Sequence, residues 1–286
     1  MKPEDHKEDA PLALPPPTVE TACVAQRGMR AVETRRSVPE ETAVAFTYNG
    51  STHAVMMATP SNLEDFAVGF SLSEGVIEKL TDIDNIEVIT TPLGIEVQIW
   101  LQEERAKTYV RRKRSMAGPT GCGLCGIESL DAAMRPLPKV SAPAWRLSPQ
   151  AVVSAMASLD PAQTLNEATH AVHAAAFWTQ AEGLVALRED VGRHNALDKL
   201  AGVMVRDKRN ATDGIVVMTS RVSIELIQKA ARLNAPVLAA VSAPTAAAIR
   251  LAQEAGITLI GVARRQDFEI FTHPDRMFSE TTRHVA

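Results

Sequence analysis

Four short apolar runs in the last third of the chain constrain its fold more than any other feature. They read GLVALRED (183–190), GIVVMTS (214–220), PVLAAVS (236–242) and ITLIGVA (257–263), and amphipathic stretches such as 224–233 and 245–254 lie between them. Strands buried on both faces that alternate with helices are typical of a mostly parallel sheet between helical layers. We therefore predict an α/β layer sandwich for residues 151–286.

The loops that follow these runs are the expected ligand site. They read REDVGRHN, TSRVS, SAPT and ARRQD, and each follows the carboxyl end of a predicted strand. In open α/β sheets, ligands bind outside the carboxyl ends of the strands. Polar and basic side chains in these loops are thus candidates for binding.

The first half of the chain has a different pattern. Two alternating apolar runs flank Asn49-Gly50, and IEVITTPLGIEVQIWL (86–101) alternates with period two around a Pro-Leu-Gly turn. Both patterns predict hairpins. Between them, Leu63, Phe66, Ala67 and Phe70 have helical spacing after Ser61 or Asn62 as N-cap. These elements predict a smaller α+β domain.

The domain boundaries follow from composition. Residues 1–22, charged and proline-rich, are expected to be a disordered tail. The α+β domain then covers 23–134, the proline-rich segment 135–150 is a linker, and 151–286 form the C-terminal α/β domain.

Composition also excludes several classes of protein. Hydrophobic residues make up 45% of the chain, which is enough for a core, and the net charge of −4 gives no general attraction to nucleic acid. Three cysteines make no disulfide framework in a chain of 286 residues, so we expect a reducing, cytoplasmic setting. The N-terminus resembles neither a signal peptide nor a membrane span.

The stretch TGCGLCG contains Cys122 and Cys125, with glycines outside and between them. Its glycines satisfy G-x-G-x-x-G, but no strand precedes it and no acidic residue lies between Asp131 and Asp160, which excludes a dinucleotide fingerprint. A deaminase zinc site is excluded because Gly121 replaces the expected proline and the one H-x-E sequence lies in the tail. A structural metal site completed by distant histidines stays open.

Thiol chemistry fits this stretch better. Flanking glycines leave the sulfurs uncovered, and the basic run at 111–114 favours thiolate. A mobile, uncovered pair suits a sulfur carrier. The alternative is two inert residues in a turn.

With these residues the chain resembles the FdhD/NarQ family of formate dehydrogenase accessory sulfurtransferases, from about Val44 to Phe271. The matching stretches are MATPSNLEDFAVGFSLSEGVI, GCGLCG, VHAAAF, REDVGRHNALDKLAG, SRVSIELIQKAA and VSAPTAAAIRLAQEAGITLIG. Two places depart from the family pattern: EETAV stands for Glu-Glu-Pro before the first strand, and Thr169-His170-Ala171 stands for Thr-Gly-Gly.

The resemblance implies a sulfurtransferase that carries sulfur from a cysteine desulfurase to the molybdenum cofactor, bis(molybdopterin guanine dinucleotide), before its insertion into apo formate dehydrogenase. Cys122 matches the persulfide carrier, and Cys125 matches the second cysteine. The resemblance also implies a homodimer, and a C-terminal domain similar to the cytidine deaminase fold without its zinc. GDP is expected to mimic part of the cofactor.

Three groups of residues are candidates for binding that cofactor. The turn before the helix at 193 offers an anion site at a helix N-terminus, although Asp190 and Asp198 would neutralise Arg193 in the alternative interpretation. The hydroxyl-bearing loops suggest a phosphate cradle, or alternatively only helix N-caps. The last loop matches the segment where the family contacts the cofactor, with the Asp267 carboxylate accepting from guanine. The candidates are Arg193, His194, Asn195, Ser220, Arg221, Ser223, Ser242, Thr245, Val262, Ala263, Arg264, Arg265, Gln266 and Asp267.

Two other functions stay open. A cofactor-binding chaperone would use the C-terminal loops without the cysteines. A zinc hydrolase or deaminase would contain stoichiometric metal.

Overall fold

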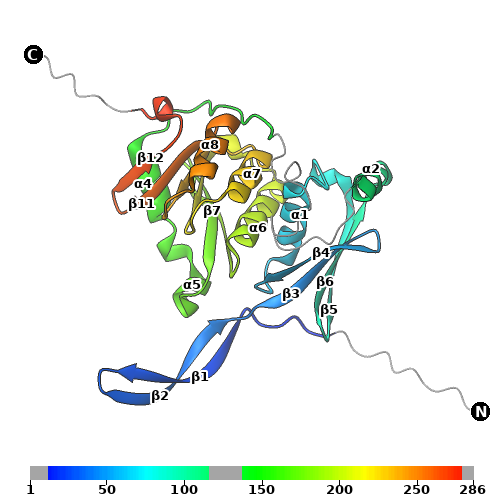
Figure 1. Ribbon diagram of the computed structural model, residues 1–286, viewed down its shortest axis with the longest axis vertical. Helices are drawn as coiled ribbons and strands as arrows, with labels where there is room; N and C mark the ends of the chain where they lie inside the picture. Colours follow the sequence, from blue (N-terminus) through cyan, green and yellow to red (C-terminus); the bar gives the residue numbers. More distant parts are fainter. Residues whose placement is uncertain (1–11, 116–136, 279–286) are drawn as a thin grey trace, which may run out of the picture.

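The structure, a computed structural model, describes residues 12–115 and 137–278. It has two sheets, each with its own core, and a projecting hairpin (Figure 1). No helix within the described residues has the length and apolarity to cross a bilayer.

The C-terminal sheet has six strands in the order β12-β11-β10-β9-β7-β8. Its strands are β7 (His173–Thr179), β8 (Gly183–Asp190), β9 (Gly214–Met218), β10 (Val237–Ala240), β11 (Thr258–Arg264) and β12 (Asp267–Ile270). The pairs β9–β10 and β10–β11 are parallel, whereas β7 and β12 are antiparallel to their neighbours. The predicted α/β layer architecture is confirmed, but the prediction of a mostly parallel sheet is wrong: only two of the five strand pairs are parallel, because the apolar runs did not reveal β7 and β12 as antiparallel strands.

Helices cover both faces of this sheet, which explains why its central strands are apolar throughout. One face packs against α6 (Arg193–Arg206), α7 (Ile224–Arg232) and α8 (Ala246–Ala255), and the other against α4 (Pro149–Ala157). Along β9, Val216 and Met218 face the first layer, while Ile215 and Val217 face α4. Alternate side chains of a strand point to opposite faces, so every residue of β9 is buried.

The N-terminal sheet has the order β4-β3-β6-β5. Its strands are β3 (Thr42–Tyr48), β4 (Ser51–Ala58), β5 (Ile83–Thr91) and β6 (Gly94–Leu101), so both predicted hairpins are confirmed. Asn49 and Gly50 have φ of 47° and 78°, as a two-residue type I′ turn requires. The helix α1 (Leu63–Ser73) packs on this sheet, where Phe46 stacks on Phe70 with ring centroids 4.4 Å apart. Asn62 is the N-cap residue, but its side chain makes no capping hydrogen bond.

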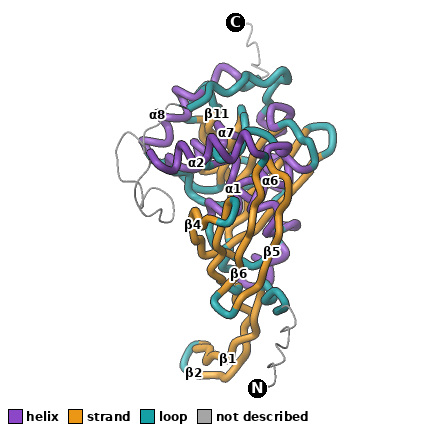
Figure 2. The backbone as a smooth tube through the Cα atoms, turned by 90° about the vertical axis from the view of Figure 1, so that its right-hand side faces the viewer, coloured by secondary structure: helices purple, strands orange, loops and turns teal. Residues whose placement is uncertain are grey.

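The helices α1 and α6 cross in close contact and join the two sheets (Figures 1 and 2). Both contribute a glycine at the crossing. A Cβ on Gly69 would lie 1.7 Å from the Asp198 carbonyl oxygen, and one on Gly202 would lie 1.8 Å from that of Asp65. The two backbones therefore touch, which leaves no room for a side chain at either position.

The expected tail and linker are both more ordered than predicted. Residues 18–22 are not disordered: they begin β1 (Thr18–Arg27), which pairs along its whole length with β2 (Arg30–Pro39). The predicted linker is not a free connection either, since Val140 and Leu147 are buried in the cores of the C-terminal unit and α4 begins at Pro149. Two further helices, α2 (Glu103–Ser115) and α5 (Thr164–Thr169), complete the described elements of four or more residues.

Candidate functional site

Four loops meet at one edge of the C-terminal sheet, which we call the carboxyl edge: residues 190–195, 219–223, 241–245 and 262–267. Backbone contacts join them in series. The Thr245 N–H donates to the Val222 carbonyl (3.0 Å), and the Val262 N–H donates to the Ser242 carbonyl (3.4 Å). His194 connects the first loop to the second, with its Nε2 3.5 Å from Ser223 Oγ. The predicted convergence of these loops is confirmed.

The first loop is anchored inside the protein by Asp190. Its Oδ2 is 2.6 Å from Lys199 Nζ and accepts the Thr59 N–H, and its Oδ1 accepts the Gly192 N–H and the Asn195 amide. Lys199 and Asp190 have no exposed surface. Burial lowers the pKa of Lys199, while the charge of Asp190 opposes that shift. This network fixes the turn before α6 against the N-terminal sheet.

Asn195 belongs to this network, not to the surface. It lies within α6, whose N-cap is Gly192, and it is buried with its Nδ2 also donating to the Met57 carbonyl (2.8 Å). Its predicted roles as a cap and as a cofactor contact are therefore wrong, because its side chain is engaged in internal hydrogen bonds.

Asp198 is likewise engaged elsewhere. Both its carboxylate oxygens lie 2.8 Å from Lys229 Nζ, and Ser73 Oγ donates to it (2.6 Å). Each of the two aspartates thus has its own lysine. The alternative in which Asp190 and Asp198 neutralise Arg193 is wrong.

Arg193 is consequently a cation without an ion-pair partner in the part of the chain described. It is the first residue of α6 and half-buried, and its Nε is buried without a hydrogen-bond partner among those residues. A guanidinium at a helix N-terminus, where backbone N–H groups are free, is suited to bind an anion. The predicted anion site at this turn is thus supported by Arg193, though not by Asn195.

Two histidines flank Arg193 and are uncharged at neutral pH. Burial, then the charges of Arg193 and Lys229, lower the pKa of His194 to about 4. Burial and Arg193 also lower the pKa of His173, the first residue of β7. Neutral imidazoles leave the positive charge of Arg193 as the dominant local charge and offer ring N–H donors. Glu225, with Oε2 3.9 Å from His194 Nε2, is the acidic neighbour of the cluster.

The hydroxyl residues of the second and third loops have mainly local roles. Ser220 is buried and donates to the Arg221 carbonyl, and Thr245 caps α8 by accepting from the Ala248 N–H (3.2 Å). Ser223 is the N-cap residue of α7 without a capping hydrogen bond, and Ser242 contributes its carbonyl to Val262. Arg221 is exposed beside them. The predicted phosphate cradle included all four hydroxyls. It is not supported at Ser220 and Thr245, because their hydroxyls already form hydrogen bonds with the backbone.

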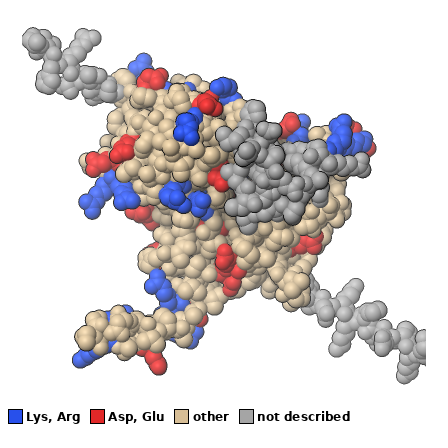
Figure 3. Space-filling model, viewed as in Figure 1, with Lys and Arg blue, Asp and Glu red and all other residues tan. Residues whose placement is uncertain are grey.

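The fourth loop is the tight turn between β11 and β12. Arg264, Arg265, Gln266 and Asp267 are exposed, and Arg264 Nε lies 3.4 Å from the Val241 carbonyl. The Ala263 side chain is buried in the core below, so it cannot contact a ligand. Figure 3 shows basic side chains grouped where β11 and β12 join. With Arg193 and Arg221, these arginines make the carboxyl edge positively charged.

The sequence interpretation missed His173, Thr59 and Lys199. His173 begins the strand beside β8 and pairs in register with Asp190, and the stretch VHAAAF was the available signal. Thr59 and Lys199 act through Asp190 and the backbone beside it, where Thr59 Oγ1 accepts the Val191 N–H, so no local pattern marked them.

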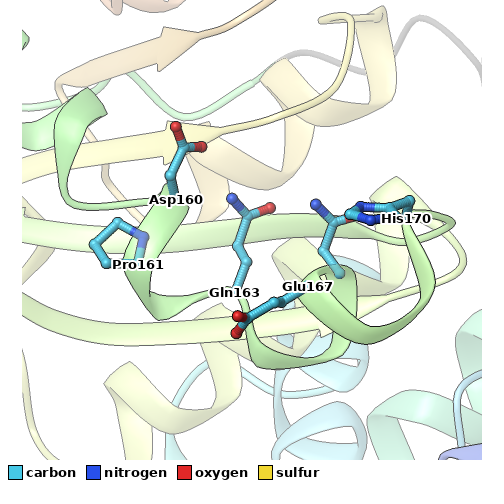
Figure 4. A pocket seen from close by; sticks show the side chains of 6 residues that line it. Asp160, Pro161, Gln163, Glu167 and His170 are labelled. Carbon is cyan, nitrogen blue, oxygen red and sulfur yellow. The ribbon is translucent and has the colours of Figure 1, made fainter.

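The candidate thiols Cys122 and Cys125 lie outside the described residues, so their position relative to the carboxyl edge stays a prediction. A separate open cavity of about 360 Å³ lies at α5, lined by Asp160, Pro161, Gln163, Asn166, Glu167 and His170 (Figure 4). None of these residues belongs to the carboxyl edge.

Comparison with known proteins gives consistent matches. The model of the FdhD/NarQ family matches residues 39–278. Proteins named sulfur carrier protein FdhD are similar: that of Agrobacterium fabrum is 55% identical over 85% of this chain and 89% of its own. That of Cupriavidus necator is 46% identical over 99% and 98%. A crystal structure of a putative formate dehydrogenase accessory protein from Desulfotalea psychrophila has a TM-score of 0.71 at 24% identity, covering 92% of this chain and all of that one.

Proposed function

Because this chain belongs to the FdhD/NarQ family, we propose that it is a sulfur carrier in formate dehydrogenase maturation. It receives sulfur on Cys122 from a cysteine desulfurase and passes it to the molybdenum cofactor, bis(molybdopterin guanine dinucleotide), which it holds as substrate at the carboxyl edge. The observation that carries the proposal is the similarity, at 46–55% identity over most of the chain, to proteins named sulfur carriers.

The loading step is a thiol–persulfide exchange. The Cys122 thiolate attacks the outer sulfur of the desulfurase persulfide, a new S–S bond forms on Cys122, and the desulfurase leaves as thiolate. No net oxidation occurs in this step. Release of the sulfur as sulfide needs two electrons, which attack of the Cys125 thiolate on Cys122 supplies as a disulfide forms between them. A dithiol reductant then restores both thiols.

The carboxyl edge supports the binding half of the proposal. Its cations Arg193, Arg264 and Arg265 suit the pyrophosphate groups of the cofactor, and the Asp267 carboxylate is an acceptor for the guanine amino group. Arg193 carries most weight because Asp190 and Asp198 are both engaged by lysines. The cytidine-deaminase likeness that the resemblance implies, and the cytoplasmic setting expected from the cysteine content, stay predictions.

The decisive experiment follows sulfur on the protein. After incubation with a desulfurase and cysteine, mass spectrometry should show a gain of about 32 Da per sulfur on Cys122. Cys122→Ala should lose this gain and fail to activate formate dehydrogenase, whereas Cys23→Ala, an exposed cysteine on β1, is the matched control and should keep both. Full activation by the Cys122→Ala protein would contradict the proposal.

The same variants separate the carrier from a cofactor-binding chaperone. A chaperone needs the anion-binding arginines but not the thiols. Loss of formate dehydrogenase activation on changing Arg264 and Arg265, together with its retention in Cys122→Ala, would favour the chaperone. Stoichiometric zinc in the purified protein would instead favour a metal-dependent hydrolase.

A further inference from the structure

The cavity at α5 is lined by a buried amide that has no hydrogen-bond partner. Gln163, the N-cap residue of α5, is 5% exposed, and its side chain forms no hydrogen bond in the part of the chain that the structure describes. Its backbone is engaged, since its carbonyl accepts the Glu167 N–H (2.8 Å). A buried amide without partners lowers stability, because it has lost its hydrogen bonds to water. The Gln163 amide is therefore available to a ligand that enters the cavity.

The lining of the cavity is negatively charged. Asp160 and Glu167 are exposed carboxylates that form no ion pair within the described residues. In the view of Figure 4, the Gln163 amide lies between them. Asn166 adds a second amide and His170 an imidazole, and the lining contains neither Lys nor Arg. The cavity therefore attracts positive charge.

A ligand with negative charge does not fit this lining. The first N–H groups of α5 are already engaged, because those of Leu165 and Asn166 each donate to the Glu189 carboxylate at 2.8 Å. Arg36 contacts the other end of α5, where its Nη2 donates to the Thr169 carbonyl (3.2 Å), but it does not line the cavity. A phosphate group, a nucleotide or a free carboxylate would therefore face the two carboxylates of the lining without a cation to balance the repulsion.

A metal ion does not fit the cavity either. Within residues 12–115 and 137–278, no three His, Cys, Asp or Glu side chains lie close enough together to hold one. The cavity, at about 360 Å³, is near the lower end of the range of roughly 300–1,000 Å³ for ligand pockets, so it admits a small organic group. The ligand class that remains is a small organic cation.

The Gln163 amide narrows this class further. A side-chain amide has an acceptor, Oε1, and a donor group, Nε2, so a ligand that satisfies both brings a donor and an acceptor side by side. An α-ammonium group next to a peptide carbonyl is such a pair, and it is mostly protonated at pH 7. Its positive charge also matches the two carboxylates of the lining. The amino-terminal residue of a chain therefore has every group that this cavity lacks.

We propose that the cavity at α5 binds the amino-terminal residue of a peptide or protein chain. The α-ammonium group pairs with the carboxylates of Asp160 and Glu167 and donates to Gln163 Oε1. The first carbonyl of the bound chain accepts from Gln163 Nε2, and the rest of that chain leaves through the open side of the cavity. This site is separate from the sulfur-carrier proposal, since none of its residues belongs to the carboxyl edge.

Alaninamide is a small probe that has this pair of groups. In a titration of the full chain followed by nitrogen–proton NMR correlation spectra, the side-chain signal of Gln163 Nε2 should shift and saturate. The backbone amides of residues 160–170 should give the same dissociation constant. N-acetylalaninamide lacks the charge, and alanine has a carboxylate in place of the neutral carbonyl. Both should bind at least about tenfold more weakly, because a charge-assisted hydrogen bond is lost or a repulsion is added.

Variants assign the binding to the named side chains. Asp160→Asn/Glu167→Gln should raise the dissociation constant of alaninamide at least about tenfold. Glu254→Gln/Asp275→Asn, which removes the same charge from exposed residues outside the cavity, is the control and should leave that constant unchanged. Gln163→Met should weaken binding about 2–10-fold and leave the midpoint of urea unfolding unchanged or raised, because an apolar replacement for an unpartnered amide is neutral or stabilising.

The proposal is overturned if the Gln163 signal does not saturate with alaninamide, or if N-acetylalaninamide binds equally well. A lower urea midpoint for Gln163→Met would also overturn it, since the amide would then have a structural partner. Agmatine, a cation without a neighbouring carbonyl, should bind more weakly than alaninamide. If agmatine binds as tightly, the cavity takes cations in general and not an amino terminus. Sulfur loading is not involved in these measurements, so their failure leaves the sulfur-carrier proposal untouched.

Discussion

Lys199 and Asp190 form an ion pair with no exposed surface, their Nζ and Oδ2 atoms 2.6 Å apart. The lysine also donates to the Thr59 carbonyl (2.8 Å), so the pair joins α6, the end of β8 and the segment after β4. It directs the acidic residue of the DVGRHN stretch into the protein interior. Arg193, three residues after Asp190, is left without an ion-pair partner in the described part of the chain.

Lys199→Met should destabilise the protein by about 3–5 kcal/mol, because removal of one partner leaves a buried charge uncompensated. Urea unfolding measures this change. The exposed Lys107 pairs with Glu103 at 2.7 Å, and Lys107→Met is the matched control, with a cost below about 1 kcal/mol. Equal costs for the two variants would show that Asp190 is neutralised in another way.

Arg193→Gln should weaken GDP binding about 10–100-fold, since a charge-assisted hydrogen bond contributes about 1.5–3 kcal/mol. Isothermal titration of the full chain provides the dissociation constants. Arg232→Gln, an exposed arginine in the last turn of α7, is the control. If wild type binds GDP and Arg193→Gln binds it equally well, the anion site lies elsewhere on the edge.

His194 should make stability depend on pH in the acid range. Its pKa is about 4 in the folded protein and about 6.5 in the unfolded chain. The unfolded chain therefore binds the proton first. Above about pH 6.5 the histidine is neutral in both states and the free energy of unfolding is at its full value. As the pH falls from 6.5 toward 4, protonation of the unfolded chain lowers the free energy of unfolding by at most about 3 kcal/mol.

His194→Gln should flatten this part of the stability profile while leaving carboxylate titration in place. Urea unfolding at a series of pH values from 4 to 7 measures it. The difference between wild type and variant isolates the histidine. A difference that stays constant over that range would contradict the burial of a neutral imidazole.

Gly69→Ala should cost several kcal/mol, because a new methyl group would overlap the Asp198 carbonyl and separate α1 from α6. The same holds for Gly202→Ala at the Asp65 carbonyl. In an exposed helix position, Gly→Ala stabilises instead. Thermal unfolding distinguishes the two situations by the direction in which the melting temperature changes. We expect a lower melting temperature for both variants, and a higher one would contradict the close crossing.

The sequence predicted the elements whose pattern is local. Apolar runs identified β9, β10 and β11, and Asn49-Gly50 identified the first hairpin of the N-terminal sheet. The hairpin of β1 and β2 was missed because neither of its faces is buried, so its sequence has no apolar face to reveal it. The helix α2 was missed because EERAKTYVRRKRS is polar.

The functional site was harder to predict because contacts between residues far apart in the sequence decide which of its side chains are free to bind a ligand. The edge loops follow from strand direction, so their meeting was predictable. Whether Asp190 would neutralise Arg193 depended on Lys199, and whether Asn195 would be free depended on the Met57 carbonyl. Neither partner has a local pattern that reveals the contact.

Val262 has a left-handed backbone, with φ of 52°, which is unusual for a β-branched residue. Such a conformation costs about 1–3 kcal/mol and persists only where its surroundings impose it. The neighbouring Ser242 carbonyl accepts its N–H at 3.4 Å, a long hydrogen bond. Val262 lies within the β-bulge between Gly261 and Arg264, so the backbone strain is located where the last loop turns the exposed Arg264 and Arg265 away from the sheet.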